Sequence, residues 1–273
     1  MNRRLAGLLV NGLLLLAASL AIFPLVWMVA VSFMPAGAAS TLPPPLWPKE
    51  PTLVHYRQLL AQGGIGRAFV NSLGLALAVT LISTFFNTLA GYAFAKLRFA
   101  GRDKIFALLI AALVIPGQVA MLPLFLMLKG MGLVNTWAGV LVPGLAGIFG
   151  IFLVRQYARG IPDELIEAAR MDGAGEFRTF FSIVLPVLKP VLVTLAVFAF
   201  LGSWNDFMWP LIVLTDGEMY TLPVALASLS REHVQDSELM MAGAVITVLP
   251  VLLLFLALQR HYMQGLLMGG VKQ

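Results

Sequence analysis

Apolar residues fill six long stretches of this chain, and polar or charged residues gather in the segments between them. A helix needs roughly 20 apolar residues to cross the hydrocarbon core of a bilayer. The six predicted membrane spans are 5–33, 68–95, 105–128, 131–154, 191–214 and 239–258. Because one helix cannot cover the whole run of 105–154, we predict a tight hairpin at Lys129-Gly130.

The first stretch follows Met1-Asn-Arg-Arg, which resembles the charged start of a signal peptide. Its apolar part is longer than the 7–15 residues typical of a cleavable signal. We therefore predict a retained helix. Cleavage after the small residues 36–38 is the alternative.

The composition supports the same class of protein. Hydrophobic residues make up 60% of the 273 residues and charged residues 11%, and there is no cysteine. Soluble domains are about 45–50% apolar and about 25% charged. We predict an all-α membrane protein with a single transmembrane domain over 1–273, and the missing cysteines exclude disulfides and thiolate chemistry.

The basic residues are distributed unevenly among the connecting segments. Thirteen of the 18 Lys and Arg residues lie in 1–4, 96–104, 155–190 and 259–273, on one side of the predicted membrane. Such an excess marks the cytoplasmic side. Both termini are thus predicted to be cytoplasmic, and no nucleic-acid role is supported, because the excess is spread over four short segments.

Small residues recur at helical spacing in two of the spans. Ser72, Ala76, Thr80, Thr84 and Thr88 follow one another at intervals of four, and a second set comprises Gly144, Gly147 and Gly150. Stripes of this kind let membrane helices approach closely. We favour helix packing over a pore lining for both sets.

The longest cytoplasmic segment, 155–190, is predicted to form two short helices joined at Gly173. Pro162 and the carboxylates after it are typical of a helix start, and glycine ends helices in the left-handed conformation. Leu165, Ala168, Ala169 and Asp172 share one face of the first helix. In the second, the apolar stripe is Phe177, Phe180, Phe181, Val184 and Leu188. Pro186 should end or kink this second helix.

Periodicity alone leaves two roles open for the first of these helices. Its alanine-rich surface admits close approach by a partner groove, and Glu167 is able to accept a charge-assisted hydrogen bond. The helix would then transmit force from a soluble subunit into the membrane. The alternative is an amphipathic helix on the lipid surface.

A resemblance to a known family separates these two roles. Glu167-Ala168-Ala169, then Gly173, then Ile183, Leu185 and Pro186 match the spacing of the "EAA" signature. That signature is found in membrane subunits of binding-protein-dependent ABC importers. The segments "IPGQVAMLPLF", "IPDELIEAARMDGA" and "WNDFMWPLI" resemble the carbohydrate-uptake branch, in particular the smaller membrane subunit of maltose-type and glycerol-phosphate-type importers.

The resemblance implies a type I importer permease fold and an assembly of several chains in the cytoplasmic (inner) membrane. The expected partners are a homologous second permease, two ATP-binding subunits, an extracytoplasmic solute-binding protein and membrane lipid. By resemblance, the residues that couple the chain to the ATPase are Glu167, Ala168, Ala169, Asp172 and Gly173. The carried solute is expected to be a sugar, oligosaccharide or related polyol.

The chain carries no motif for chemistry of its own. It lacks the G-x-x-x-x-G-K-[ST] phosphate loop, and His55, His233 and His261 are scattered along it without metal-ligand spacing. We expect no cofactor or metal in this chain and no ATPase activity. ATP and Mg²⁺ would be bound by the partner ATPase.

Polar residues inside the predicted spans are candidates for the translocation path. The candidates are Trp204, Asn205, Asp206, Gln118 and Asn87. A tryptophan face can stack on a sugar ring, and the polar groups can bond hydroxyls. The alternatives are an interfacial position within an aromatic belt for Asp206 and helix–helix hydrogen bonds for Gln118 and Asn87.

Two outer loops and two other functions complete the interpretation. The loops 34–67 and 215–238 either contact the binding protein or are solvated. An ion-coupled secondary transporter would need several buried carboxylates or an inverted repeat, and neither is evident. A non-transporting membrane scaffold would leave the EAA signature unexplained.

Overall fold

The computed structural model describes residues 3–61, 64–232 and 236–270, and these form helices, turns and loops without a β-strand. Five helices are long and apolar enough to cross a membrane, or six if the bent pair α4–α5 counts as one span. The predicted all-helical membrane fold is therefore confirmed. The chain divides into two compact units, Met1–Arg67 with Leu222–Leu253, and Ala68–Thr221 with Leu254–Gln273.

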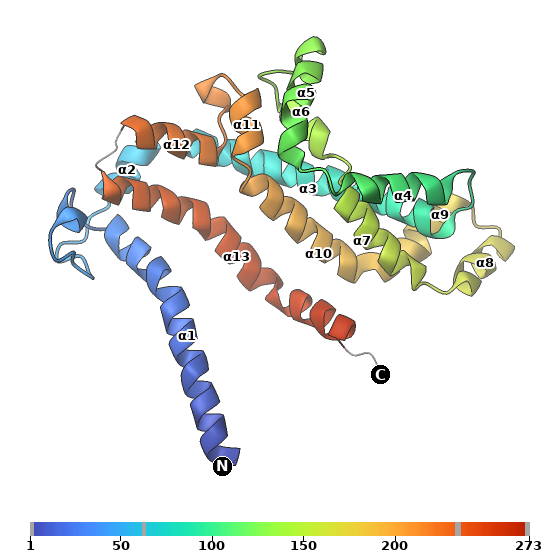
Figure 1. The fold of residues 1–273 in the computed structure, drawn as a ribbon, viewed down its shortest axis with the longest axis horizontal. Helices are drawn as coiled ribbons and strands as arrows, with labels where there is room; N and C mark the ends of the chain where they lie inside the picture. Colours follow the sequence, from blue (N-terminus) through green and yellow to red (C-terminus); the bar gives the residue numbers. More distant parts are fainter. Residues whose placement is uncertain (1–2, 62–63, 233–235, 271–273) are drawn as a thin grey trace. The chain divides into compact units, whose positions relative to one another are not determined.

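Unit 1 is built on the two long helices α1 (Arg3–Ser32) and α13 (Ser237–Gly270), the latter contributing its first part (Figure 1). It also holds η1 (Ala38–Ser40), α2 (Val54–Ala61) and α12 (Leu222–Glu232). Ala30, Val31 and Met34 form one of its buried clusters, at the end of α1. A Cβ on Gly243 would come within 2.5 Å of Leu226 Cδ2, so glycine permits the close contact of α13 with α12.

Unit 2 carries the remaining helices, of which α3 (Ile65–Lys96) is the longest. Its other elements are α4 (Arg102–Ala112), α5 (Gly117–Gly130), α6 (Trp137–Leu141), η2 (Val142–Gly144), α7 (Ile148–Arg159), α8 (Asp163–Met171), α9 (Glu176–Thr179), η3 (Phe180–Val184), α10 (Leu185–Trp204), α11 (Met208–Val213) and η4 (Gly217–Met219). Helices α7 and α10 pack side by side (Figure 1). Their buried apolar cluster extends from Leu195 to Tyr92 on α3 and to Ile166 on α8.

The third predicted span is not one helix. Helices α4 and α5 meet at a bend of 105° across a four-residue break. Pro116 lies at this break as the residue before α5, with an extended backbone. Proline has no N–H to continue a helix and disfavours helical geometry in the residue before it, which explains the interruption.

The predicted hairpin between the third and fourth spans is present, but the fourth span begins later than residue 131. Helix α5 ends at Gly130, and the turn includes left-handed Gly132 and Asn135. The Thr136 side chain then accepts a hydrogen bond from the Gly139 N–H and caps α6. The span runs over Trp137–Arg159 and is interrupted by η2, where Pro143 lies.

The fifth predicted span is also displaced. Its helix begins within the cytoplasmic segment, since α9 passes through the π-helical turn η3 directly into α10. Of the two predicted effects of Pro186, the end of the second helix is therefore wrong, since the helix continues through this residue. The wide turn η3 ends at Val184, just ahead of Pro186, where an ordinary α-helical turn would bring the ring against a carbonyl. At the other end α10 stops at Trp204, and α11 follows after a break at residues 205–207.

Candidate functional site

Helix α8 holds the EAA residues, and both of its ends are well defined. Pro162 precedes the helix, Asp163 and Glu164 occupy its first turn, and Gly173 has φ of 78°. The Gly173 N–H donates to the Arg170 carbonyl at 3.0 Å, and the Ala174 N–H donates to the Ala169 carbonyl at 2.9 Å. This is the Schellman arrangement, and it confirms the predicted role of Gly173 as the end of the helix.

One face of α8 is buried and the opposite one is open. Ile166 and Ala169 are buried, and Ile166 joins the apolar cluster of α7 and α10. Glu167, Ala168, Asp172 and Gly173 are exposed. The predicted shared face is wrong in one respect, because Ala169 points inward while Leu165 and Ala168 are exposed.

Two polar contacts tie α8 to the rest of unit 2. Lys96, at the end of α3, donates to the Ile161 carbonyl at 2.6 Å and to Asp163 Oδ1 at 2.5 Å. On the other side Arg170 pairs with Glu176 at 2.8 Å. The hydrogen bond and the positive charge of Lys96 hold the pKa of Asp163 below its usual value.

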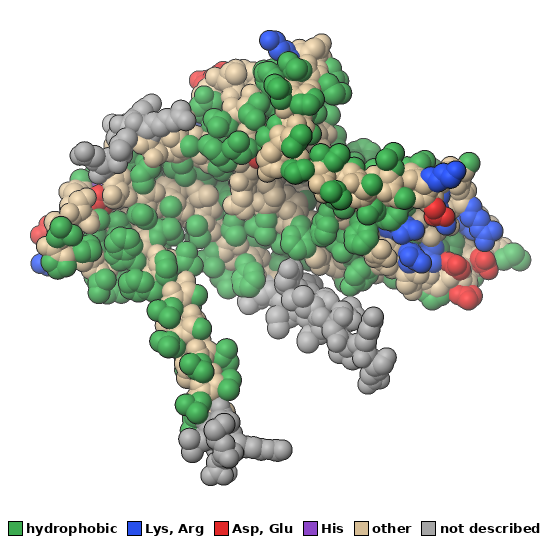
Figure 2. Space-filling view, in the orientation of Figure 1, with side chains coloured by type: hydrophobic (Ala, Val, Ile, Leu, Met, Phe, Trp, Pro, Cys, Tyr) green, Lys and Arg blue, Asp and Glu red, His purple; other side chains and the backbone are tan. Residues whose placement is uncertain are grey.

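Charged side chains gather around these contacts. Figure 2 shows Lys, Arg, Asp and Glu over α4, α8 and α9, whereas hydrophobic side chains dominate the rest of the visible face of unit 2. The Arg102–Asp103 pair at the start of α4, 3.0 Å long, belongs to this charged end. The contacts of Lys96 with Ile161 and Asp163 were not predicted, because Lys96 lies 65 and 67 residues away from them along the sequence. The Arg170–Glu176 pair lies within one segment and was not predicted either.

A second feature of unit 2 is a cavity of about 440 Å³ between α3, α5, α7, α10 and α11. Asn87 and Asp206, two of the predicted path residues, both line it. Gly144, Gly147 and Gly150 line it as well, so the predicted packing stripe also borders an open space. A Cβ on Gly150 would lie 2.5 Å from Asn87 Nδ2, so this glycine makes room for the amide.

The cavity wall contains buried polar side chains that lack hydrogen-bond partners among the described residues, which is unusual in a protein. Asn87, Ser83 and Thr221 are each 3% exposed, and their side-chain oxygens have no hydrogen-bond partner in the described part of the chain. The predicted helix–helix hydrogen bond of Asn87 is absent there. Asp206 accepts a bond from the Trp209 N–H at 3.3 Å, and the Trp209 indole donates to the Gly139 carbonyl at 3.1 Å.

Three other predicted path residues lie outside the cavity lining. Trp204 is 1% exposed and packs edge-on against Phe69 and parallel to Phe200, so its rings are core rather than a stacking surface. Asn205 is exposed and its amide donates to the Leu201 carbonyl. Gln118 is exposed on α5. Trp209 lines the cavity in place of Trp204 and was missed by the sequence analysis, although the second Trp of "WNDFMW" was a signal that would have found it.

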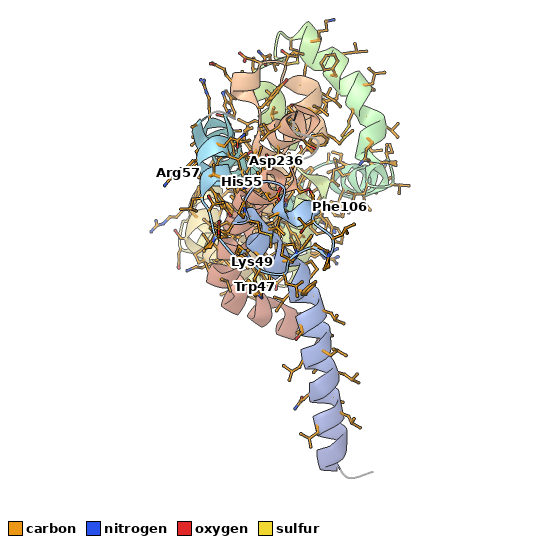
Figure 3. The ribbon with its side chains drawn as sticks, turned by 90° about the vertical axis from the view of Figure 1, so that its left-hand side faces the viewer. Trp47, Lys49, His55, Arg57, Phe106 and Asp236 are labelled. Atoms are coloured by element: carbon orange, nitrogen blue, oxygen red, sulfur yellow. The ribbon has the colours of Figure 1, made fainter. Side chains whose placement is uncertain are left out.

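Unit 1 holds a buried polar group that the sequence pattern missed. Glu238 is fully buried, and its Oε1 accepts a hydrogen bond from the Ala39 N–H at 2.7 Å. His55 is also buried, with Nε2 2.9 Å from the Met34 carbonyl oxygen and Nδ1 4.0 Å from Asp236 Oδ1 (Figure 3). The acidic residues of 215–238 are thus not simply solvated. His233 and the side chain of His261 lie outside the described residues.

Apolar helices long enough to span a membrane, a capped and tethered short helix, and a polar cavity between helices are features of a helical membrane protein. The family described as "Binding-protein-dependent transport system inner membrane component" matches residues 87–267. The chain belongs to this family. Its permease fold, expected from the EAA spacing, is thereby confirmed.

Named relatives extend over nearly the whole chain. The arabinooligosaccharides transport system permease protein AraQ of Halalkalibacterium halodurans is 37% identical, covering 93% of this chain and 92% of the relative. The lactose transport system permease protein LacG of Rhizobium radiobacter is 33% identical, covering 100% and 98%. A crystal structure of a bacterial ABC transporter for import of the acidic polysaccharide alginate contains a chain with the same fold, at a TM-score of 0.85 and 22% identity over 95% of this chain and 98% of that one.

Proposed function

We propose that this chain is the permease subunit of an ATP-driven importer that carries a sugar, oligosaccharide or related polyol by alternating access. The observation that carries the proposal is α8, a short helix that buries Ile166 and Ala169, exposes Glu167 and Ala168, and ends at Gly173 in the left-handed conformation. The relatives named for arabinooligosaccharide and lactose transport support the substrate class.

In this proposal α8 is the coupling helix. Its exposed residues Glu167, Ala168 and Asp172 dock into an ATP-binding subunit, which hydrolyses the ATP that this chain does not. Motion of α8 reaches the membrane helices through its buried face, because Ile166 packs in the same apolar cluster as α7 and α10. A helix that made no contact with α7 and α10 would move without displacing these helices.

The remaining parts of the assembly follow from the family. A homologous second permease completes the path, two ATP-binding subunits meet the coupling helices, and an extracytoplasmic binding protein delivers the solute. Both termini and α8 then lie in the cytoplasm, as the distribution of Lys and Arg predicts. Asn87 and Asp206 border the translocation path from the cavity of unit 2.

The test uses the complete importer reconstituted in proteoliposomes with its binding protein. We expect Glu167→Lys and Gly173→Asp to abolish uptake of neutral oligosaccharides while the chain still inserts. Glu164→Lys and Gly175→Asp are matched controls, since both positions are exposed and Gly175 has an ordinary φ of −69°. Normal uptake by the first pair, together with normal binding of the ATPase, would overturn the coupling role.

A second measurement tests which subunit hydrolyses ATP. The purified chain alone should hydrolyse no ATP, and hydrolysis should appear only when the ATP-binding subunits are added. Activity of the isolated chain would contradict the proposal. An ion-coupled transporter would instead accumulate solute in proteoliposomes that lack ATP but carry an ion gradient.

A further inference from the structure

We infer that the cavity of unit 2 is a solute subsite that admits uncharged, hydroxyl-rich solutes and rejects acidic ones, with Asp206 setting this selectivity. The inference rests on the proposed function and narrows its substrate class. It starts from the unsatisfied polar atoms of the cavity wall and from the sign of the charge beside them.

The first step concerns hydrogen bonding. Buried polar groups in proteins nearly always have hydrogen-bond partners, and a missing partner destabilises the folded chain. Asn87 Oδ1, Ser83 Oγ and Thr221 Oγ1 have no partner among the described residues, and all three belong to residues lining one cavity. Polar atoms that lack partners around a shared cavity gain hydrogen bonds when a solute or water occupies that cavity.

The second step concerns the kind of group that fits. An amide oxygen and a carboxylate accept hydrogen bonds, and hydroxyls both donate and accept. Asn87 and Asp206 therefore require donors, and Ser83 and Thr221 adapt to either. A sugar or polyol offers many O–H groups with this dual character, while the apolar part of the lining, such as Phe198 and Leu195, suits its C–H faces.

The third step concerns charge. Asp206 is the one ionisable side chain of the cavity lining among the described residues, and no Lys, Arg or His accompanies it. An acidic solute entering this space would lose its hydration without meeting a cation, and it would face a carboxylate at short range. An uncharged solute has neither penalty, so the cavity discriminates by charge.

The absence of cysteine makes this directly measurable. Ser203→Cys, in a complex whose other subunits carry no reactive thiol, places one thiol on the cavity wall, and Ser40→Cys places one on the exposed surface of unit 1. Each variant is treated with two methanethiosulfonates of similar size, one cationic and one anionic. The thiolate attacks the sulfenyl sulfur, forms a mixed disulfide and releases methanesulfinate.

The expected result is a change in the ratio of the two labelling rates. In the Ser203→Cys background, Asp206→Asn should lower the cation-over-anion ratio by about fivefold or more, because a unit charge acts at short range in a weakly screened site. Asp206→Glu should keep the ratio. Asn retains an acceptor for the Trp209 N–H, so the local turn is preserved. In the Ser40→Cys background the ratio should not change.

Solute protection completes the test. In the complex without binding protein, arabinotriose should slow labelling of the Ser203→Cys variant by the neutral reagent N-ethylmaleimide, and an oligogalacturonate of equal length should not. Equal protection by both sugars, no protection by either, or an unchanged rate ratio in Asp206→Asn would overturn the inference. Failure of the proposed function shows differently, as a reconstituted importer whose uptake and ATPase rate respond to no carbohydrate.

Discussion

Lys96 is the last residue of α3 and Asp163 is the first residue of α8, and their side chains form an ion pair of 2.5 Å. The Lys96 side chain is 7% exposed and that of Asp163 is 74% exposed. The lysine also donates to the Ile161 carbonyl, so it holds both the approach to α8 and its first residue. The end of a long spanning helix is thus attached directly to the proposed coupling helix.

This attachment predicts a specific defect. Lys96→Met should lower uptake severalfold in the reconstituted importer while ATP hydrolysis continues, because α8 loses its polar connection to α3. Arg102→Met removes the neighbouring Arg102–Asp103 pair and serves as the matched control. A constant ratio of transport to hydrolysis in Lys96→Met would contradict a coupling role for this contact.

The same pair predicts how the contact depends on pH. Lys96 lowers the pKa of Asp163. The stabilisation that this ion pair gives is therefore present above the ordinary carboxylate pKa of about 3.9, and it is lost as the pH falls through the lower pKa of Asp163 in the folded chain. Hydrogen exchange at the start of α8 should therefore show no loss of protection specific to this pair between about pH 8 and pH 5. A loss of protection over this pH range in the wild-type chain that is absent from Asp163→Asn would contradict this prediction.

Gly173 predicts a backbone effect separate from any contact. Beyond its chain neighbours, no atom of the described residues lies within 4 Å of a Cβ built there, but φ is +78°. Gly173→Ala should cost about 1 kcal/mol through strain alone, and Gly173→Asn should cost less, since asparagine tolerates this region better. Circular dichroism melting of the detergent-solubilised chain measures the difference. Gly175→Ala, which has open space and negative φ, is the control and should be near neutral.

Two glycines of α3 predict opposite outcomes for the same substitution. A Cβ on Gly91 would lie 2.6 Å from Val154 Cβ, so Gly91→Ala must push α3 and α7 apart and should cost about 1–3 kcal/mol. A Cβ on Gly74 would meet no other part of the described chain within 4 Å, and Gly74→Ala should be neutral or stabilising. Thermal unfolding of the two variants in the same detergent tests the contrast. Equal melting temperatures would show that this crossing is loose.

The buried Glu238 predicts an effect on the loop that follows α1. Glu238→Ala leaves the Ala39 N–H without its acceptor, and we expect faster protease cleavage within 34–50. Glu238→Gln retains an oxygen acceptor at the same position and should cleave at a rate close to wild type. If both variants resist cleavage as wild type does, the bond does not order this loop.

Much of the fold follows from local sequence. Long apolar runs must become helices, because only helices satisfy every backbone group of a single segment within hydrocarbon. The start of α8 at Asp163 and its end at Gly173 also depend on neighbouring residues alone, namely Pro162, two carboxylates and a glycine. The EAA spacing, which led to the family, lies within one continuous segment.

The helix breaks were harder to place, because proline occurs both at breaks and within continuous helices. Pro116 interrupts a helix, whereas Pro186 and Pro190 do not, and the difference lies in what surrounds them. The widened turn η3 precedes Pro186, and the buried residues Val184 and Leu188 pack against neighbouring helices. Tertiary packing thus decides whether a proline ends a helix or is accommodated.

The cavity of unit 2 was decided by tertiary contacts. The sequence by itself determined that the chain is a helical membrane protein with an importer signature, because apolar length and motif spacing are properties of single segments. Only the folded chain brings Asn87 beside Gly150, lines one cavity with Asn87 and Asp206, and buries Trp204 while Trp209 reaches the cavity. These residues lie on different helices, and the direction of a side chain on a helix is fixed by what the helix packs against.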